Sequence, residues 1–144
     1  MSNDYGYDIK LINVNKIIAT EHHCKEHAYK LSQIIKVESV WTDPLIIEKN
    51  KFFVMDGHHR LAAAQLLGFS NIPCILLEYS DSRLSVSSWR PEFEITESLI
   101  NQYVQKQALL PYKTTRHTLN PKPKKIKITI NELTQNESTC SYAF

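Results

Sequence analysis

The sequence has few cysteines, no long apolar run and no strong excess of charge. Its three cysteines are an odd number without CxxC spacing, which argues against a disulfide framework and against a zinc site. No stretch has the length of a membrane span, and the polar start of the chain does not resemble a signal peptide. These absences predict a reducing, cytoplasmic setting and no membrane partner. The net charge of +2 suits small anions and nucleic acid equally, so it identifies no partner.

The composition and the apolar periodicity predict an α+β protein with a small mixed sheet and flanking helices. The chain has 144 residues, 42% of them hydrophobic, and contains no internal repeat, so it suits one domain with its own core. We expect this domain over residues 1–133 and a flexible tail over residues 134–144. Apolar patterns, capping residues and turn residues predict strands over 7–12, 44–48, 52–55, 72–79 and 126–130, and helices over 21–36, 61–67 and 97–104.

Five consecutive polar residues, 56–60, join the predicted strand 52–55 to the predicted helix that Gly68 ends. The free backbone N–H groups and the dipole of a helix N-terminus attract anions, and Gly57 lets the backbone approach a phosphate closely. Arg60 adds a planar fork suited to phosphate. Asp56 would be repelled by a phosphate unless a cation lay between them, so it indicates a magnesium ligand. The alternative is that Asp56 is a helix cap and that the histidines of this segment are solvated.

Two other segments carry residues of the same chemistry. Thr20 has the character of an N-cap, which predicts that Glu21 projects from the first turn of a helix, either as a dipole partner or as a catalytic base. The segment 113–117 offers two cations, two hydroxyls and an imidazole, which suit either a solvated basic loop or an anion cradle. Cys24 lies on the apolar stripe of the predicted helix and is interpreted as a core residue. The pair His58 and His59 does not indicate zinc, because neighbouring helical side chains point about 100° apart.

These segments together resemble a known family. The run Asp56-Gly57-His58-His59-Arg60, with an alanine-rich helix ending in Leu67-Gly68, resembles the nucleotide-binding motif of the ParB/sulfiredoxin superfamily. With Thr20-Glu21-His22 upstream and residues 113–117 downstream, it is similar to the free L-serine kinases of the SerK and SbnI type. Those enzymes transfer a phosphoryl group from a nucleotide to the hydroxyl of free serine. The resemblance spans about residues 7 to 133.

The resemblance implies a role for each motif. Glu21 matches the family's catalytic base, and Asp56 matches its metal-associated acidic residue. It implies phosphate or nucleotide contacts by Gly57, His58, His59 and Arg60. It implies serine and phosphate contacts by Trp89, Lys113, Thr114, Thr115, Arg116 and His117. The expected cofactors are Mg²⁺ and ATP or ADP as the phosphate donor. The expected partners are an amino acid and a nucleotide rather than nucleic acid. A homodimer is compatible with these expectations.

The chain also departs from the patterns of this superfamily. The serine kinases carry a long additional segment between the two phosphate motifs, whereas here only residues 61–112 separate them. The sulfiredoxins have a reactive cysteine where this chain has His58, which argues against sulfinic-acid reduction. ParB uses a more arginine-rich motif followed by a helix-turn-helix domain, for which this chain has no room.

Three functional classes therefore remain open from the sequence. The leading class is a small-molecule kinase for serine or a similar hydroxy amino acid. The second is a nucleotide-sensing or ligand-sensing regulator that touches DNA through its basic residues 113–127. The third is a non-catalytic partner or a nuclease-like hydrolase. Glu21 discriminates between them, because a pure binding protein has no need of a base beside a phosphate site.

Overall fold

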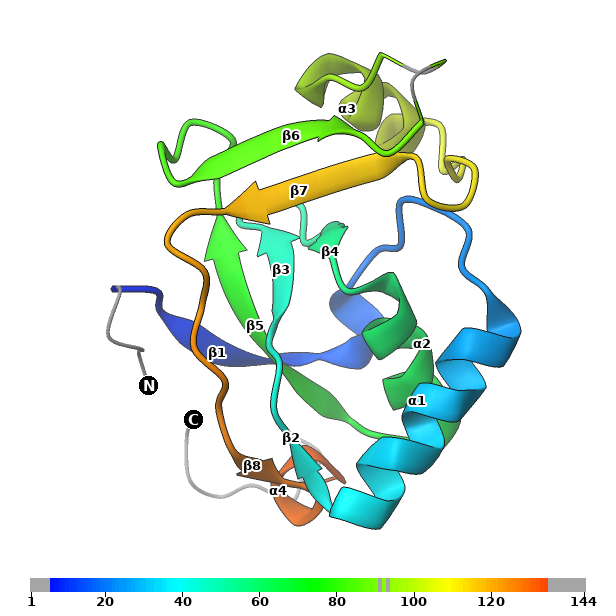
Figure 1. Ribbon diagram of the computed structural model, residues 1–144, viewed down its shortest axis with the longest axis vertical. Coiled ribbons are helices and arrows are strands. Elements are labelled where there is room, and N and C mark those ends of the chain that lie inside the picture. Colours follow the sequence, from blue (N-terminus) through cyan, green and yellow to red (C-terminus); the bar gives the residue numbers. More distant parts are fainter. Residues whose placement is uncertain (1–5, 91, 93, 135–144) are drawn as a thin grey trace.

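The structure is a computed structural model, and it describes residues 6–90, 92 and 94–134. A small mixed sheet, helices on its flank and a separate strand pair make up the fold (Figure 1). The described elements follow in this order: β1 Ile9–Asn13, the short 3₁₀-helix η1 Val14–Lys16, α1 Lys25–Glu38, β2 Val40–Trp41, β3 Leu45–Glu48, β4 Val54–Asp56, α2 His58–Leu67, β5 Asn71–Leu77, β6 Leu84–Ser88, α3 Glu97–Gln105, β7 Thr115–Leu119, β8 Ile128–Thr129 and α4 Ile130–Thr134.

The main sheet has four strands in the order β1-β5-β3-β4. β5 runs antiparallel to β1 and parallel to β3, and β3 runs antiparallel to β4, so the sheet is mixed. Its interior strands are apolar along most of their length because both faces are covered. On β3, for example, Leu45 and Ile47 belong to one core cluster while Ile46 belongs to the other. This architecture confirms the predicted α+β class.

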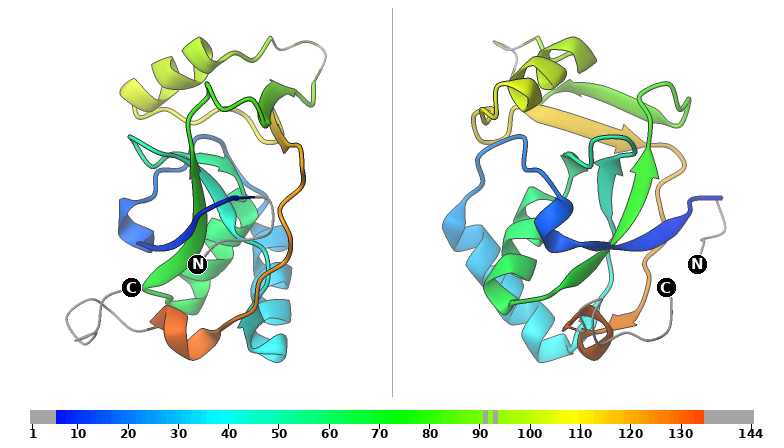
Figure 2. Two further views of the ribbon diagram at one scale, coloured as in Figure 1. Left: turned by 90° about the vertical axis from the view of Figure 1, so that its left-hand side faces the viewer. Right: turned by 180° about the vertical axis from the view of Figure 1, so that it is seen from behind.

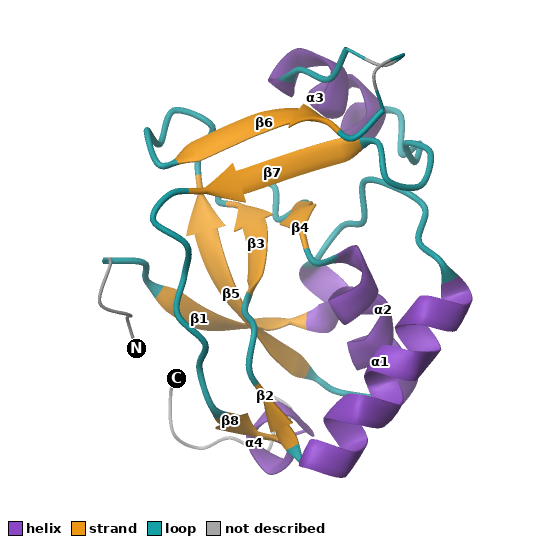
Figure 3. Cartoon of the chain, viewed as in Figure 1, coloured by secondary structure: helices purple, strands orange, loops and turns teal. Residues whose placement is uncertain are grey.

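The two longer helices lie side by side against one flank of the sheet (Figure 3). α2 buries three consecutive alanines, which let the helix approach the core closely. Gly68 ends α2 in the left-handed conformation, and its N–H donates to the carbonyl of Ala64, as expected for a glycine at this position. The predicted C-terminal end of this helix is therefore confirmed.

The strand pair β6–β7 crosses one end of the main sheet, and α3 packs on the outer side of this pair (Figures 1 and 2). β4 ends beneath the pair, and β4 and β7 are in contact. The N-terminus of α2 follows β4 after one residue, Gly57. The phosphate-type motif and the segment 113–117 therefore meet at this end of the sheet.

Several predicted elements are confirmed. The strand over 7–12 is the edge strand β1, the hairpin over 44–55 is β3–β4, and the strand over 72–79 is the interior strand β5. Thr96 caps α3, because its hydroxyl accepts from the N–H of Leu99. Cys74 is a buried free thiol of the core. The prediction that Cys24 is a core residue is wrong, because this free thiol is only half-buried and its residue is the N-cap of α1.

The predicted start of the first helix is wrong. α1 begins at Lys25 with Cys24 as its N-cap, so Thr20 is not a cap and Glu21 is not in a first turn. Residues 18–22 are extended, because they find backbone partners elsewhere in the chain. The N–H of Leu110 donates to the carbonyl of Thr20, and the N–H of His22 donates to the carbonyl of Leu110, both at 2.8 Å. These long-range bonds outweigh the local capping preference.

Two further predictions need correction. The polar connection predicted over 81–91 contains β6, and residues 115–117 of the segment 113–117 belong to β7, so neither segment is a simple loop: β6 and β7 are paired strands. The pattern over 126–130 yields only the two-residue strand β8, because α4 begins at Ile130. Residues 135–144, which make up nearly all of the predicted tail, lie outside the described residues. No helix in the described part of the chain is long and apolar enough to cross a membrane.

The backbone at Gly57 generates a prediction about stability. Gly57 has φ +114°, and an added Cβ would lie 2.9 Å from Cγ of Leu45. Gly57→Ala therefore combines backbone strain with a core clash, and we expect it to lower the free energy of unfolding by about 2–3 kcal/mol. Gly68→Ala is the matched control, because φ is +72° there but no atom lies within 4 Å of the added Cβ. Gly68→Ala should lower the free energy of unfolding by about 1–2 kcal/mol. Urea unfolding checks both values, and equal losses would contradict the close packing at Gly57.

Candidate active site

A cavity of about 360 Å³ lies at the N-terminus of α2, between α1 and the β6–β7 pair. It brings together most of the residues that the sequence singled out, although they come from segments far apart in the chain. The predicted residues that line it are Glu21, Asp56, Gly57, His58, His59, Arg60, Trp89, Lys113 and Thr115. Sequence reasoning missed three others that complete the wall, namely His27, Leu31 and Met55.

The N-terminus of α2 is open to a ligand. Gly57 is its N-cap and provides no side-chain hydrogen bond, so the first N–H groups of the helix are not capped by a side chain. The alternative that Asp56 caps this helix is therefore wrong, because Asp56 is the last residue of β4. Uncapped N–H groups at the positive end of a helix are a favourable place for a phosphate.

Asp56 and Arg60 form an ion pair beside these N–H groups. Nη2 of Arg60 lies 3.5 Å from Oδ2 of Asp56, and about half of the Asp56 side chain is exposed. Nη1 of Arg60 donates to the carbonyl of Pro44 at 2.7 Å, which fixes the guanidinium against β3. The pair presents one positive and one negative group to the cavity. Its long distance and its exposure make it a weak contact that a ligand is able to displace.

Glu21 reaches the cavity from the extended segment that precedes α1. Its side chain is buried, and its Oε2 accepts from the N–H of Thr115 at 3.1 Å and from the Thr115 hydroxyl at 2.8 Å. Both bonds use the same carboxylate oxygen. Because Thr115 is the first residue of β7, these bonds join the segment around Glu21 to the strand pair above the sheet.

His58 holds the segment of Glu21 against α2. Its ring is buried, and its Nε2 accepts from the N–H of Thr20 at 3.1 Å and from the N–H of Glu21 at 3.3 Å. Two N–H donors on one ring nitrogen require that this nitrogen carry no proton. Burial, and then the nearby His117, His59 and His23, lower the pKa of His58 to about 3. His58 is therefore a neutral acceptor that is committed to backbone N–H groups.

His59 belongs to a cluster of aromatic rings on the α1 side of the cavity. Its Nε2 accepts from the N–H of Cys24 at 3.1 Å, and its ring lies over that of His27 with 4.2 Å between centroids. The Tyr112 ring meets it edge-on. Burial, and then His27, His23 and Lys113, lower the pKa of His59 to about 4. His59 thus fixes the start of α1, much as His58 fixes the segment before it.

The segment 113–117 is divided between different environments. Lys113 and Thr115 line the cavity. Thr114 does not, because its hydroxyl is committed to the carbonyl of Pro111 at 2.7 Å and its side chain is buried. The assignment of Thr114 as a substrate contact is therefore corrected. Successive side chains of a strand alternate between its faces, so a run of five residues cannot all face one ligand.

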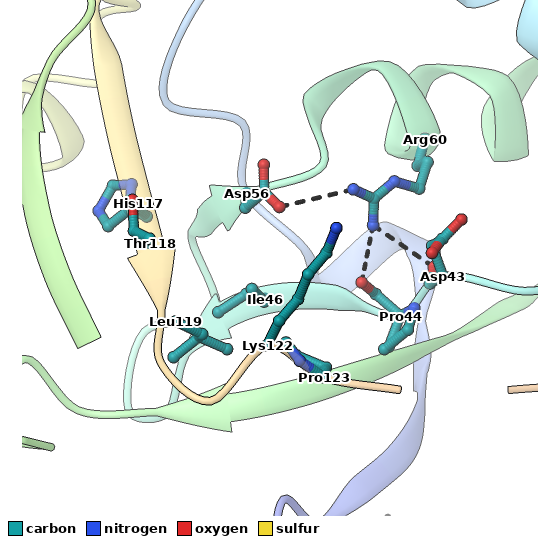
Figure 4. A pocket seen from close by; sticks show the side chains of 10 residues that line it. All are labelled: Asp43, Pro44, Ile46, Asp56, Arg60, His117, Thr118, Leu119, Lys122 and Pro123. Atoms are coloured by element: carbon teal, nitrogen blue, oxygen red, sulfur yellow. Dashed lines mark hydrogen bonds and ion pairs between the residues drawn. The ribbon is translucent and has the colours of Figure 1, made fainter. Parts of the chain in front are cut away.

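The last two residues of this segment have partners of their own. The guanidinium of Arg116 lies over the Trp89 ring, with Cζ 4.4 Å from its centroid, at the edge of the cavity. Nε2 of His117 lies 2.9 Å from the Tyr79 hydroxyl, and burial lowers the pKa of His117 to about 4. Trp89 is more than half exposed and lines the cavity itself. Arg116 therefore contacts the cavity wall at Trp89 without lining the cavity, and His117 lines a neighbouring cavity that also includes Asp56 and Arg60 (Figure 4).

The protein by itself offers an incomplete set of ligands for a metal ion, so a bound molecule would have to supply the others. Within residues 6–90, 92 and 94–134, no group of three or more histidine, cysteine, aspartate or glutamate side chains is placed to hold one. Asp56 is a single carboxylate beside the open helix N-terminus. That arrangement fits Mg²⁺, which usually takes one or two carboxylates and completes its octahedron with water and substrate phosphates.

Comparison with known proteins identifies the family. The model of the ParB N-terminal domain matches residues 6–88, which include β1 to β6 and the whole of α2. The chain belongs to the ParB N-terminal domain family. The match includes Glu21 and residues 56–60, but it ends before residues 113–117.

Curated relatives of this ParB-family chain include serine kinases. The ATP-dependent L-serine kinase of Staphylothermus marinus is 33% identical over 85 residues, which are 56% of this chain and 34% of that protein. The ADP-dependent L-serine kinase SerK of Thermococcus kodakarensis is 23% identical over 106 residues, which are 71% of this chain and 44% of that protein. The chain thus spans about a third to under a half of the length of these relatives.

Solved structures agree with the fold of the ParB-family chain. A free serine kinase in complex with AMP superimposes with a TM-score of 0.79 at 15% identity, over 88% of this chain and 94% of that one. SbnI of Staphylococcus aureus with a C-terminal truncation gives a TM-score of 0.79 at 14% identity, over 90% of each chain. At these identities the likeness establishes a shared fold.

The buried His58 generates a prediction about pH. Because its pKa falls from 6.5 in the unfolded chain to about 3 in the folded chain, protonation favours unfolding, and stability is lost as pH falls from about 6.5 towards 3. His58→Gln keeps an acceptor for the two N–H groups but removes this titration. Between pH 7 and 4.5 we expect the wild type to lose about 2–3 kcal/mol more free energy of unfolding than the variant.

Urea unfolding at several pH values between 7 and 4.5 measures this difference. His22→Gln is the matched control, because His22 lies next to the same segment with an exposed side chain. It should follow the pH dependence of the wild type. Parallel curves for the wild type and His58→Gln would show that His58 is not held neutral in the fold.

Proposed function

We propose that this chain is a small-molecule kinase that transfers a phosphoryl group from ATP or ADP to the hydroxyl of free L-serine or a similar hydroxy amino acid, giving O-phospho-L-serine. One observation carries the proposal: a single cavity contains both the buried carboxylate of Glu21 and the uncapped N-terminus of α2. Phosphoryl transfer needs a base for the acceptor and a site that neutralises phosphate charge. The L-serine kinase activities named for the relatives support this choice of reaction.

Glu21 is proposed as the general base. Thr115 occupies Oε2 through two hydrogen bonds and so fixes the carboxylate, while Oε1 remains for the acceptor hydroxyl. As the hydroxyl oxygen bonds to phosphorus, its proton passes to Glu21 and the bond from phosphorus to the nucleotide oxygen breaks. A nucleotide-binding sensor would have no use for a buried carboxylate at this place, because a carboxylate repels phosphate.

Charge on the transferred phosphate is neutralised from the side of α2. The free N–H groups after Gly57 and the guanidinium of Arg60 are the proposed contacts, with Asp56 as the protein ligand of Mg²⁺ that arrives on the nucleotide. Bound there, the ion would offset the negative charge of the phosphates. Asp56 would then give up its weak ion pair with Arg60 and bind the metal ion instead. The guanidinium of Arg60 would thereby become available to the phosphate.

Lys113 and Trp89 are the proposed contacts of the amino acid, whereas Thr115 acts indirectly by holding the Glu21 carboxylate. Lys113 offers a charge for the carboxylate, and its ammonium also lies 5.6 Å from the centroid of the Tyr112 ring. The Trp89 ring covers the cavity edge, with Arg116 stacked on it. His58 and His59 act here by fixing the segment of Glu21 and the start of α1, respectively, rather than as positive charges, because both rings accept backbone N–H bonds.

The activity is tested directly with purified protein. The chain is incubated with Mg²⁺, either ATP or ADP, and a panel of free amino acids, and mass spectrometry identifies phosphorylated products. We expect a mass increase of one phosphoryl group on L-serine or on a similar hydroxy amino acid. Nucleotide binding without transfer to any amino acid would overturn the kinase proposal in favour of a nucleotide sensor.

The role of Glu21 is tested by Glu21→Gln. The amide still accepts from Thr115 but is not a base, so turnover should fall by roughly 10²-fold or more while nucleotide affinity stays nearly unchanged. Steady-state kinetics and calorimetric titration with the nucleotide measure the two quantities.

Glu48→Gln is the matched control. Glu48 is equally buried and accepts backbone bonds from Asn50 and Lys51, but it does not line the cavity. This variant should keep the turnover of the wild type. If Glu21→Gln also kept it, Glu21 would be a structural residue and the base would lie elsewhere.

A further inference from the structure

Lys113 lines the cavity from a turn whose backbone is strained. Residues 111–114 form this turn directly before β7, and the hydroxyl of Thr114 donates to the carbonyl of Pro111 at 2.7 Å. Lys113 has φ +53°, in the left-handed region. Glycine and asparagine are usual at such a turn position, because other L-residues bring their Cβ close to the following carbonyl oxygen. A lysine in this conformation persists only where the surrounding structure holds it there.

Arg90 supplies one of the contacts that hold this turn. Its Nη2 donates to the carbonyl of Tyr112 at 2.6 Å. That carbonyl belongs to the same planar peptide unit as the N–H of Lys113. Because the bond fixes the orientation of this peptide plane, it also restricts φ of Lys113. Arg90 does not line the cavity itself, so it acts on the cavity through the turn.

The backbone of Arg90 is fixed as well. Oγ of Ser88 accepts from the N–H of Arg90 at 3.0 Å, and the Ser88 hydroxyl donates to the Arg90 carbonyl at 2.8 Å. The N–H of Trp89 donates to the carbonyl of Thr114 at 3.3 Å, which continues the pairing of β6 with β7 by one residue. The Arg90 guanidinium therefore approaches the turn from a fixed position.

The side chain of Tyr112 holds the other side of the turn. Its ring meets the His59 ring edge-on, with 5.7 Å between centroids, and the Lys113 ammonium lies 5.6 Å from the centroid of the same ring. The turn is thus held at its backbone by Arg90 and at its side chain by α2. Two such contacts on one residue account for the strained conformation of the next.

We propose that Arg90 is a positioning residue for the acceptor, because its bond to Tyr112 holds Lys113 in the conformation from which this side chain lines the cavity. The inference rests on the proposed function, which takes Lys113 as the contact of the amino-acid carboxylate. A cation that is ordered before binding loses less conformational freedom when the acceptor arrives. Arg90 lies outside the motifs that the sequence singled out, so the structure alone gives it this role.

Replacement of Arg90 tests the effect on the acceptor. Arg90→Met keeps an apolar stem of similar length but loses the donor, so the KM for L-serine should rise about tenfold while kcat and ADP affinity stay within about twofold. Arg90→Lys keeps one donor and should stay within about threefold of the wild-type KM. Arg83→Met is the matched control, since Arg83 pairs with Asp81 at 2.8 Å away from the cavity. It should leave the KM within about twofold of the wild type.

A double-mutant cycle tests whether Arg90 acts through Lys113. Once Lys113→Met has removed the ammonium, the added Arg90→Met should change the KM for L-serine by less than about twofold. Effects that multiply in the double variant would show that Arg90 acts independently of Lys113, and would overturn the inference.

Hydrogen exchange measures the turn without any substrate. In Arg90→Met the amides of Lys113 and Thr114 should exchange at least about fivefold faster, while those of β3 keep their wild-type rates. Unchanged exchange at these two amides, or a fall in kcat with an unchanged KM, would overturn the positioning role. Faster exchange in a chain that phosphorylates no amino acid would uphold the action of Arg90 on the turn and overturn the kinase proposal.

Discussion

The arrangement of the site depends on one interaction, the acceptance of two backbone N–H groups by Nε2 of His58. These bonds fix residues Thr20 and Glu21 against the N-terminus of α2, at 3.1 and 3.3 Å. They join the segment of Glu21 directly to the helix end that faces its carboxylate across the cavity, while Thr115 holds the carboxylate itself. A neutral imidazole is suited to this role, because a buried acceptor with two donors is satisfied and carries no charge that needs a counterion.

The extended segment that contains Thr20 and Glu21 also connects α2 with the loop after α3 and with the strand pair β6–β7. The carbonyl of Thr20 accepts from Leu110, and the carboxylate of Glu21 accepts from Thr115, so this segment reaches both the loop after α3 and the first residue of β7. The strand pair β6–β7 is thereby held above the end of the main sheet. Cavity residues on the side of this strand pair, such as Trp89 and Lys113, then face the cavity residues of α2. The cavity is enclosed because the segment of Glu21 joins the strand pair β6–β7 to the end of the main sheet and to α2.

Several features of the fold and of the candidate site could be predicted from particular residues. Gly68 marked the C-terminal end of α2, the polar run 56–60 marked residues that line the cavity, and Thr96 marked the start of α3. The start of α1 was missed because Thr20 has local capping character, whereas its hydroxyl in fact donates to the carbonyl of Val54, 34 residues away. His27 and Leu31 were missed as cavity residues because their helix gives no sign of what it faces.

The sequence by itself determined the α+β class, a helix N-terminus at residues 56–60 and the residue types around it. Those features depend on neighbours in the chain, such as glycine conformations, apolar periodicity and caps. Only the tertiary structure decided which members of each motif face the cavity, for instance Thr115 rather than Thr114. It also decided that His58 accepts backbone bonds and that a second cavity borders Arg60. The physical reason is that strand pairing and burial between distant segments determine which side chains point into the cavity and which of their polar atoms already have partners.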